Sequence, residues 1–168
     1  MILWITGLPG AGKTELALQA LEFLRDPSQP FRDKVIGLDG DDIRDVSIVR
    51  AGYRADDRLV FASNVLAISK LLSEQGKLVV VSMVGMFPPL FDAVAGWSEL
   101  KLVYLDASLG VRDKLRPELY GDPQFRIQLE SWKAPEHADL TLFARKASER
   151  SGWFAELREA LASWRDEG

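Results

Sequence analysis

The residues from Gly7 to Thr14 have the types and the spacing needed to hold phosphate groups. They read GLPGAGKT, which satisfies the pattern G-x-x-x-x-G-K-[ST]. Glycines let the backbone curl until successive N–H groups point at phosphate oxygens, the lysine adds a positive charge there, and the threonine hydroxyl can ligate Mg²⁺. The N-terminus of a following helix favours the same anion. We therefore predict a nucleoside triphosphate site formed by Gly7, Gly10, Ala11, Gly12, Lys13, Thr14 and Glu15.

A second group of chemically capable residues is the acidic stretch LDGDDIRD, which contains Asp39, Asp41, Asp42 and Asp45. It directly follows an apolar run that reads as a strand. The carboxyl ends of parallel strands face the ligand crevice, so these carboxylates should lie near the phosphate loop. A carboxylate there can organise Mg²⁺ or take the proton from an attacking hydroxyl. Asp39 and Asp41 are the main candidates, and the alternative is an acidic first turn of a helix.

Continuous apolar runs predict the strands that must position these groups. Such runs, without alternation of polar and apolar residues, are typical of strands buried on both faces of a sheet. They occur at residues 2–6, 34–38, 77–84, 101–105 and 138–143.

Helical periodicity lies between and after these runs, over residues 12–25, over 56–76, where Gly76 ends the pattern, and over 151–168. This alternation predicts an α/β fold of three layers, a P-loop NTPase-type parallel sheet of about five strands with helices on both faces. We expect a single domain over residues 1–168. Residues 115–137 lack clear periodicity, and long irregular segments in compact domains often act as lids, so we predict a lid at about 115–134.

Composition narrows the classes of partner. A formal net charge of -4 and a pI near 5.1 argue against nucleic acid or anionic lipid as the partner, because these need a large basic surface. The absence of cysteine excludes disulfides, thiolate metal sites and cysteine nucleophiles, and it fits a cytoplasmic location. The apolar start of the chain is too short for a signal peptide or a membrane span.

Three motifs in order, ILWITGLPGAGKT, LDGDDIR and GYRADDR, resemble the adenylylsulfate kinase family. That family transfers the γ-phosphate of ATP to the 3'-hydroxyl of adenosine 5'-phosphosulfate. Its members read like LDGDNxR followed by GFSxxDR, with the same spacing as here. The resemblance therefore implies ATP and Mg²⁺, a small-molecule nucleotide acceptor and a possible homodimer.

The resemblance also implies roles for individual residues. Asp41 would be the catalytic base or a magnesium-organising carboxylate, with Thr14 as the other metal ligand. Arg44 and Arg58 would contact anionic groups of the acceptor, and Tyr53 and Phe125 would stack on its base. Taken without the resemblance, these aromatic rings could equally be packed under loops, and the arginines could be surface charges. Arg116, in RPELY, is implied as a lid arginine that binds the triphosphate.

The acceptor motifs depart from the family. Phe61 stands where the family has an asparagine that helps to read the nucleotide, and the third strand ends in VGMFP, from Val84 to Pro88, where the family has an arginine. The phosphate loop and the aspartates are kept. We therefore keep two alternatives open: a kinase of a different modified nucleotide, such as cytidine diphosphoramidate, and another small-molecule P-loop kinase. A GTPase switch is disfavoured because the chain has no Asn-Lys-x-Asp stretch.

Overall fold

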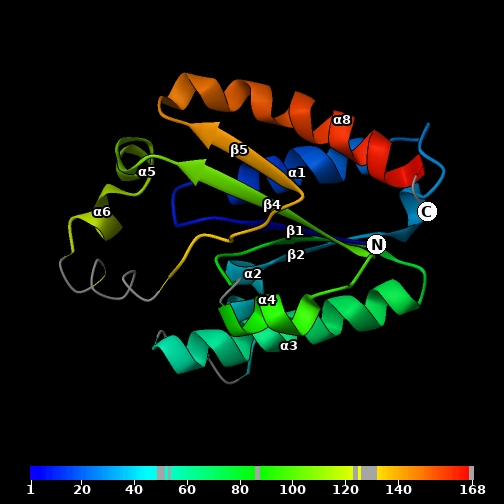
Figure 1. The fold of residues 1–168 in the computed structure, drawn as a ribbon, viewed down its shortest axis with the longest axis horizontal. Coiled ribbons are helices and arrows are strands. Elements are labelled where there is room, and N and C mark those ends of the chain that lie inside the picture. Colours follow the sequence, from blue (N-terminus) through cyan, green and yellow to red (C-terminus); the bar gives the residue numbers. More distant parts are fainter. Residues whose placement is uncertain (49–51, 53, 86–87, 123–124, 126–131, 167–168) are drawn as a thin grey trace.

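A five-stranded parallel sheet forms the centre of the molecule (Figure 1). The computed structural model describes residues 1–48, 52, 54–85, 88–122, 125 and 132–166. The strands lie in the order β2-β3-β1-β4-β5, and every neighbouring pair is parallel. This confirms the predicted sheet. The strands are β1 (Ile2–Thr6), β2 (Val35–Asp39), β3 (Leu78–Ser82), β4 (Leu100–Ala107) and β5 (Leu140–Ala144).

Helices cover both faces of the sheet, as predicted. Figure 1 shows α1 and α8 on one side and α3 and α4 on the other, with α5 and α6 beyond the ends of β4 and β5. The long helices are α1 (Lys13–Leu24), α3 (Ala55–Glu74) and α8 (Trp153–Asp166). The short elements are α2 (Gly40–Val46), α4 (Pro88–Val94), α5 (Leu109–Leu115), α6 (Pro117–Tyr120) and the 3-10 helices η1 (Arg32–Lys34) and η2 (Ala147–Gly152).

The long helices correspond to the three predicted helical stretches. Helix α3 stops at Glu74, and Gly76 follows with φ +76°, a conformation that glycine adopts without steric cost. The short helices were not predicted, because a helix of seven residues or fewer completes too few turns to show a clear period.

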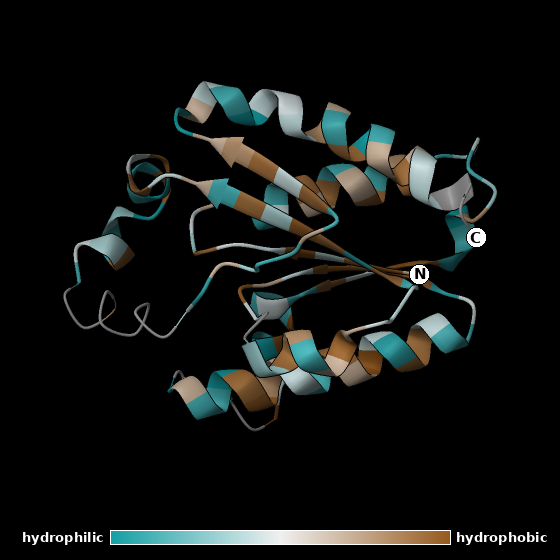
Figure 2. Cartoon of the chain, viewed as in Figure 1, coloured by the Kyte–Doolittle hydropathy of each residue, from teal (hydrophilic) through white to brown (hydrophobic). Residues whose placement is uncertain are grey.

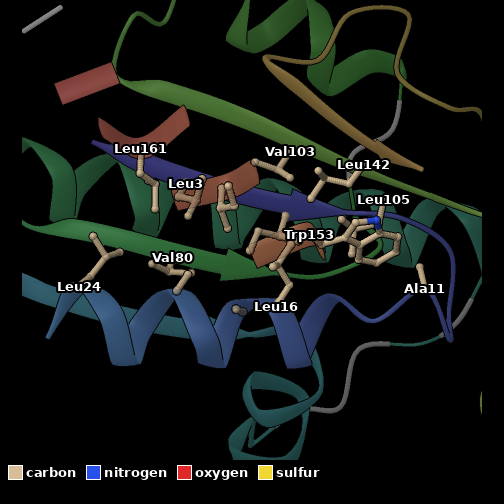
Figure 3. Packing of buried hydrophobic residues seen from close by; sticks show 14 of the residues in the cluster. Leu3, Ala11, Leu16, Leu24, Val80, Val103, Leu105, Leu142, Trp153 and Leu161 are labelled. Carbon is tan, nitrogen blue, oxygen red and sulfur yellow. The ribbon is translucent and has the colours of Figure 1, made fainter. Parts of the chain in front are cut away.

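The central strand β1 supplies side chains to two separate hydrophobic clusters, because successive residues of a strand point to opposite faces. Leu3 and Ile5 belong to the cluster beneath α1 and α8, which we call the α1/α8 cluster (Figure 3). Ile2 and Trp4 belong to the α3/α4 cluster on the other face. All four are fully buried, which explains why the run ILWIT has no polar alternation.

Figure 2 shows hydrophobic colour on the central strands and mixed colours along the helices, as expected for helices with one face on a sheet. In the part of the chain that the structure describes, we find no helix with the length and apolar character required to cross a bilayer.

Candidate active site

The phosphate loop connects β1 to α1 at the carboxyl edge of the sheet. Gly10 and Gly12 have φ +75° and +104°, which a residue with a side chain rarely adopts. A Cβ at Gly10 would also lie 2.7 Å from the carbonyl oxygen of Arg112, so α5 packs directly against the loop. Ala11 is fully buried in the α1/α8 cluster and anchors the loop to the core. The loop is therefore held in one conformation from both sides.

Lys13 is the first residue of α1, and its Nζ donates a hydrogen bond back to the carbonyl oxygen of Leu8, 3.2 Å away. Desolvation lowers the pKa of Lys13 to about 8. The carboxylates of Asp41 and Asp39 oppose this shift, and the Arg116 guanidinium adds to it. An anion bound in the loop would favour the charged lysine and raise its pKa.

The carboxylate of Asp39 joins three elements at the end of β2. Its Oδ1 accepts a hydrogen bond from the backbone N–H of Asp41, 2.9 Å away, which caps α2. Its Oδ2 accepts hydrogen bonds from the hydroxyls of Thr14, at 2.9 Å, and Ser82, at 2.5 Å. The parallel register aligns Asp39 with Ser82, so the two strand ends deliver these side chains to the same point. Ser82 is 4% exposed and was not singled out from the sequence.

Asp41 lies two residues after Asp39, exposed on the first turn of α2. Among the groups that raise the pKa of Lys13 its carboxylate has the largest effect, which places its charge close to the phosphate loop. Asp42 and Asp45 are exposed further along the same helix. The structure thus presents one carboxylate fixed by three hydrogen bonds and a second, exposed carboxylate that lines the same cavity as Lys13.

A cavity of about 580 Å³ opens above these groups, which is within the usual size range of small-molecule sites. It is lined from the phosphate loop, α2, α3, the end of β3, α5, α6 and η2. Gly7 and Ala11 are not among its lining residues, and Tyr53 lies outside the described residues. The predicted site residues that line the cavity are Gly10, Gly12, Lys13, Thr14, Glu15, Asp39, Asp41, Arg44, Arg58, Phe61, Val84, Arg116 and Phe125.

Phe61 and Arg44 form one wall of this cavity. The guanidinium carbon of Arg44 lies 4.1 Å from the centroid of the Phe61 ring, a cation–π contact. Arg44 Nη1 also donates a hydrogen bond to the carbonyl oxygen of Gly52, 3.3 Å away. Phe61 is 8% exposed and belongs to the α3/α4 cluster, so its ring is both core and cavity wall. Arg58, from the same helix, lines the cavity and is half-buried.

The end of β3 closes the cavity below Phe61. The carbonyl oxygen of Val84 accepts hydrogen bonds from the indole of Trp132, at 3.3 Å, and from the Thr6 hydroxyl, at 3.4 Å. The Trp132 ring lies 5.9 Å from that of Tyr104 on β4. The backbone at Val84 is therefore held by hydrogen bonds from two separate parts of the chain.

Tyr120 braces the phosphate loop from α6. Its buried hydroxyl donates to the carbonyl oxygen of Pro9, at 2.6 Å, and accepts from Arg112 Nη1, also at 2.6 Å. The ring of Phe125 meets the Tyr120 ring edge to face, with centroids 5.6 Å apart. Arg116 lines the cavity nearby, and its Nε donates to Glu118 at 2.7 Å. The sequence did not indicate the contact between Tyr120 and the loop.

Arg150, from η2, is a further cavity residue that the sequence analysis missed. It forms an ion pair with Glu15 on the other side of the phosphate loop.

The sheet, the phosphate loop and the carboxylates at the end of β2 together define a P-loop phosphotransferase. A sequence model of the family described as Adenylylsulphate kinase matches residues 1–122. The chain belongs to this family, whose members are phosphotransferases with a hydroxyl acceptor, and the resemblance of the three motifs is thereby confirmed.

Individual relatives agree with the family match. An adenylyl-sulfate kinase of Bacillus velezensis is 30% identical over 155 residues, which cover 86% of this chain and 77% of that protein. A cytidine diphosphoramidate kinase of Campylobacter jejuni is 32% identical over 91 residues, which cover 54% of this chain and 51% of that protein. The APS kinase CysC of Mycobacterium tuberculosis, solved with AMPPNP and APS, shares the fold with a TM-score of 0.77 at 21% identity, with 96% of each chain covered.

Proposed function

We propose that this protein transfers the γ-phosphate of ATP to a sugar hydroxyl of a nucleotide acceptor, with adenosine 5'-phosphosulfate as the first candidate. The observation that carries the proposal is the position of the Asp39 carboxylate. It accepts hydrogen bonds from the hydroxyls of Thr14 and Ser82, and its charge acts on Lys13 of the phosphate loop. This arrangement joins a phosphate-binding loop to an oriented carboxylate at the mouth of a cavity large enough for a nucleotide.

Residues of the site fit a magnesium ion. The Thr14 hydroxyl and the carboxylates of Asp39 and Asp41 are the hard oxygen donors that Mg²⁺ prefers. Among the residues described, no cluster of three or more acidic, histidine or cysteine side chains forms a dedicated metal cage. This suits Mg²⁺ in a kinase, which takes one or two protein ligands and completes its shell with phosphate and water. When bound, the ion would neutralise charge that develops on the phosphates.

The proposed transfer assigns separate tasks to the two aspartates. The oxygens of Asp39 already accept three hydrogen bonds, and they orient the Thr14 hydroxyl, the Ser82 hydroxyl and the first turn of α2. Asp41, exposed on the cavity wall, accepts the proton of the acceptor hydroxyl as that oxygen bonds to the γ-phosphorus. The bond between the γ-phosphorus and the oxygen that bridges to the β-phosphate breaks, and ADP leaves. Lys13 offsets the negative charge of the β- and γ-phosphates throughout.

Residues on α5 and α6 support a role of the segment at about 115–134 as a lid. The cavity that Asp41 lines is also lined by Leu115, Arg116, Leu119 and Phe125. We propose that this segment closes over the bound substrates and excludes water, which limits hydrolysis of ATP.

A second candidate acceptor is a different modified nucleotide, such as cytidine diphosphoramidate. The position of Phe61 on the cavity wall favours it, because a phenyl ring cannot make the hydrogen bonds that the family's asparagine makes. The relative from Campylobacter jejuni carries the name of such an enzyme.

Turnover measurements separate the candidates. The purified protein would be assayed for ADP formation with Mg²⁺, ATP and one acceptor at a time: adenosine 5'-phosphosulfate, cytidine diphosphate derivatives and simple sugars. Lys13→Ala is the control for contaminating kinases, since it removes the loop cation. Turnover on adenosine 5'-phosphosulfate supports the first candidate, and turnover on a cytidine nucleotide alone supports the second. Turnover on a sugar alone contradicts a nucleotide acceptor.

Location and assembly complete the proposal. We propose a cytoplasmic protein, because a chain of 168 residues without cysteine suits a reducing compartment. We also propose a homodimer, on the family resemblance, and sedimentation analysis of the purified protein tests it.

A further inference from the structure

Arg150 rests directly on the phosphate loop, although it lies beyond the part of the chain that the family model matches. It belongs to η2, between β5 and α8, and lines the cavity together with Lys13 and Thr14. A Cβ placed on Gly12 would lie 2.4 Å from Arg150 Nη2 and 2.9 Å from its Cζ. The guanidinium is therefore in contact with the Cα of Gly12, and a side chain at Gly12 would displace it.

The partner of Arg150 in this structure is the carboxylate of Glu15, which accepts a hydrogen bond from Nη2. The two side chains differ in burial, because 14% of the Arg150 side chain is exposed and 65% of the Glu15 side chain. The Nε of Arg150 is buried and makes no hydrogen bond within the described part of the chain. The arginine thus has unused donor capacity, and most of the side chain of its carboxylate partner is exposed to solvent.

The guanidinium of Arg150 contacts the first residue of α8. Its Cζ lies 5.7 Å from the centroid of the Trp153 ring, which is 2% exposed. The indole of Trp153 donates a hydrogen bond to the carbonyl oxygen of Phe143, at 3.1 Å. Figure 3 shows Trp153 inside the α1/α8 cluster, close to Leu16 and Leu105. The packing holds the arginine at the loop, whichever anion it binds.

The position along the loop identifies the anion. In a loop of this kind the lysine reaches the β- and γ-phosphates, and the backbone N–H groups hold the α- and β-phosphates. Lys13 Nζ bonds Leu8 at one end of the loop, and Arg150 lies against Gly12 and pairs with the Glu15 side chain at the other. A guanidinium fork matches phosphate oxygens in geometry and charge.

We propose that Arg150 binds the α-phosphate of the donor nucleotide, and that Glu15 holds the guanidinium in place until the nucleotide displaces it. The inference rests on the proposed function, since it requires a nucleoside di- or triphosphate in the loop. It adds a cationic contact from outside the family motifs to the donor site. The competing explanation is an ion pair that only ties α1 to η2 and does not touch the nucleotide.

The decisive comparison is between E15Q and E15Q/R150Q. Both variants lack the Glu15 carboxylate, so they differ only in whether Arg150 is present. Dissociation constants for ADP would be measured by titration calorimetry in the presence of Mg²⁺. A direct contact with the α-phosphate predicts that E15Q binds ADP at least as tightly as the wild-type chain, and that E15Q/R150Q binds about tenfold or more weakly than E15Q. If Arg150 serves only to neutralise Glu15, the two variants bind ADP equally, and equal affinities within twofold overturn the inference.

Two further measurements keep the result interpretable. Melting temperatures of both variants show whether they are folded at the assay temperature. If E15Q/R150Q is unfolded there, E15Q/R150K replaces it, because lysine keeps the charge and the apolar stem but loses the fork. It should bind ADP several-fold more weakly than E15Q, and equal binding would overturn the inference. A wild-type chain that does not bind ADP would refute the proposed function itself, and the inference with it.

Discussion

Replacement of Lys13 by arginine should abolish a proton uptake that accompanies nucleotide binding near pH 8. Desolvation lowers the pKa of Lys13 to about 8, so in the empty site the lysine loses its proton within the working pH range. A polyphosphate in the loop favours the ammonium and restores the pKa to a higher value. Binding must then draw a proton from solvent for every neutral Lys13. Arginine keeps the charge and does not titrate in this range.

The expected size follows from the fraction of neutral lysine. With a pKa of about 8, that fraction is about 0.1 at pH 7, about 0.5 at pH 8 and about 0.9 at pH 9. Proton uptake per bound ADP should follow these values. If ADP binds only to the protein with charged Lys13, its dissociation constant should be about twice the low-pH value at pH 8. At pH 9 it should be about ten times the low-pH value. Affinity thus falls as pH rises, because the favourable cation is lost.

Titration calorimetry in buffers with different ionisation enthalpies measures this uptake directly. The wild-type chain and K13R would be compared at pH 7, 8 and 9, so that protons exchanged by ADP itself cancel in the difference. An equal uptake by both proteins at pH 8 would refute the reasoning, since the proton would then belong to another group. The pH dependence of folding stability has the opposite sign to that of ADP affinity. The pKa of Lys13 is 10.5 in the unfolded chain and about 8 in the folded one, so above about pH 8 the unfolded chain binds more protons. The contribution of Lys13 to the free energy of unfolding therefore increases as the pH rises above about 8.

Three other substitutions test separate contacts. Ser82→Ala removes one of the two hydrogen bonds that Oδ2 of Asp39 accepts and should lower kcat about tenfold, with little change in melting temperature or KM for ATP; Ser69→Ala, which removes a buried hydroxyl bonded within its own helix, is the matched control and should leave kcat unchanged. Phe61→Asn should alter the acceptor profile in the turnover panel and leave the dissociation constant for ADP within about twofold, and an unchanged profile would count against Phe61 as an acceptor residue. Tyr120→Phe removes the hydroxyl that donates a hydrogen bond to the carbonyl oxygen of Pro9. It should lower the free energy of unfolding by about 1 kcal/mol, or the melting temperature by about 2–4 °C, and raise the KM for ATP. An unchanged melting curve would show that the phosphate loop does not depend on α6.

The sheet could be predicted from the sequence because its strands are buried on both faces. Runs such as ILWIT and LVVVS contain almost no polar residue, and a fold with helices on both faces of a parallel sheet explains this. The phosphate loop could be predicted because its function depends on local backbone conformation, which the glycines of one short segment determine.

The remaining site residues depend on which elements are neighbours in space. Ser82 meets Asp39 because β2 and β3 are adjacent and in register, and hydrophobic periodicity does not report strand order. Arg150 reaches Glu15 across 135 positions of sequence, through a 3-10 helix too short to have a pattern. Contacts of this kind carry no local signal, so Ser82 and Arg150 could not be named in advance, whereas the family resemblance named cavity residues such as Arg44, Arg58 and Arg116.

The two hydrophobic clusters on opposite faces of the sheet bear on how this enzyme could diverge. Ala11 in the phosphate loop and Leu16 in α1 pack in the α1/α8 cluster, whereas Phe61 and Met83, which line the cavity, pack in the α3/α4 cluster. Substitutions in separate clusters without shared partners usually have additive effects on stability. A lineage can therefore accumulate changes in one layer without repacking the other. That independence allows acceptor residues to change while the phosphate loop is kept, and in this chain the loop motif is kept while the motifs at Phe61 and at the end of β3 depart from the family.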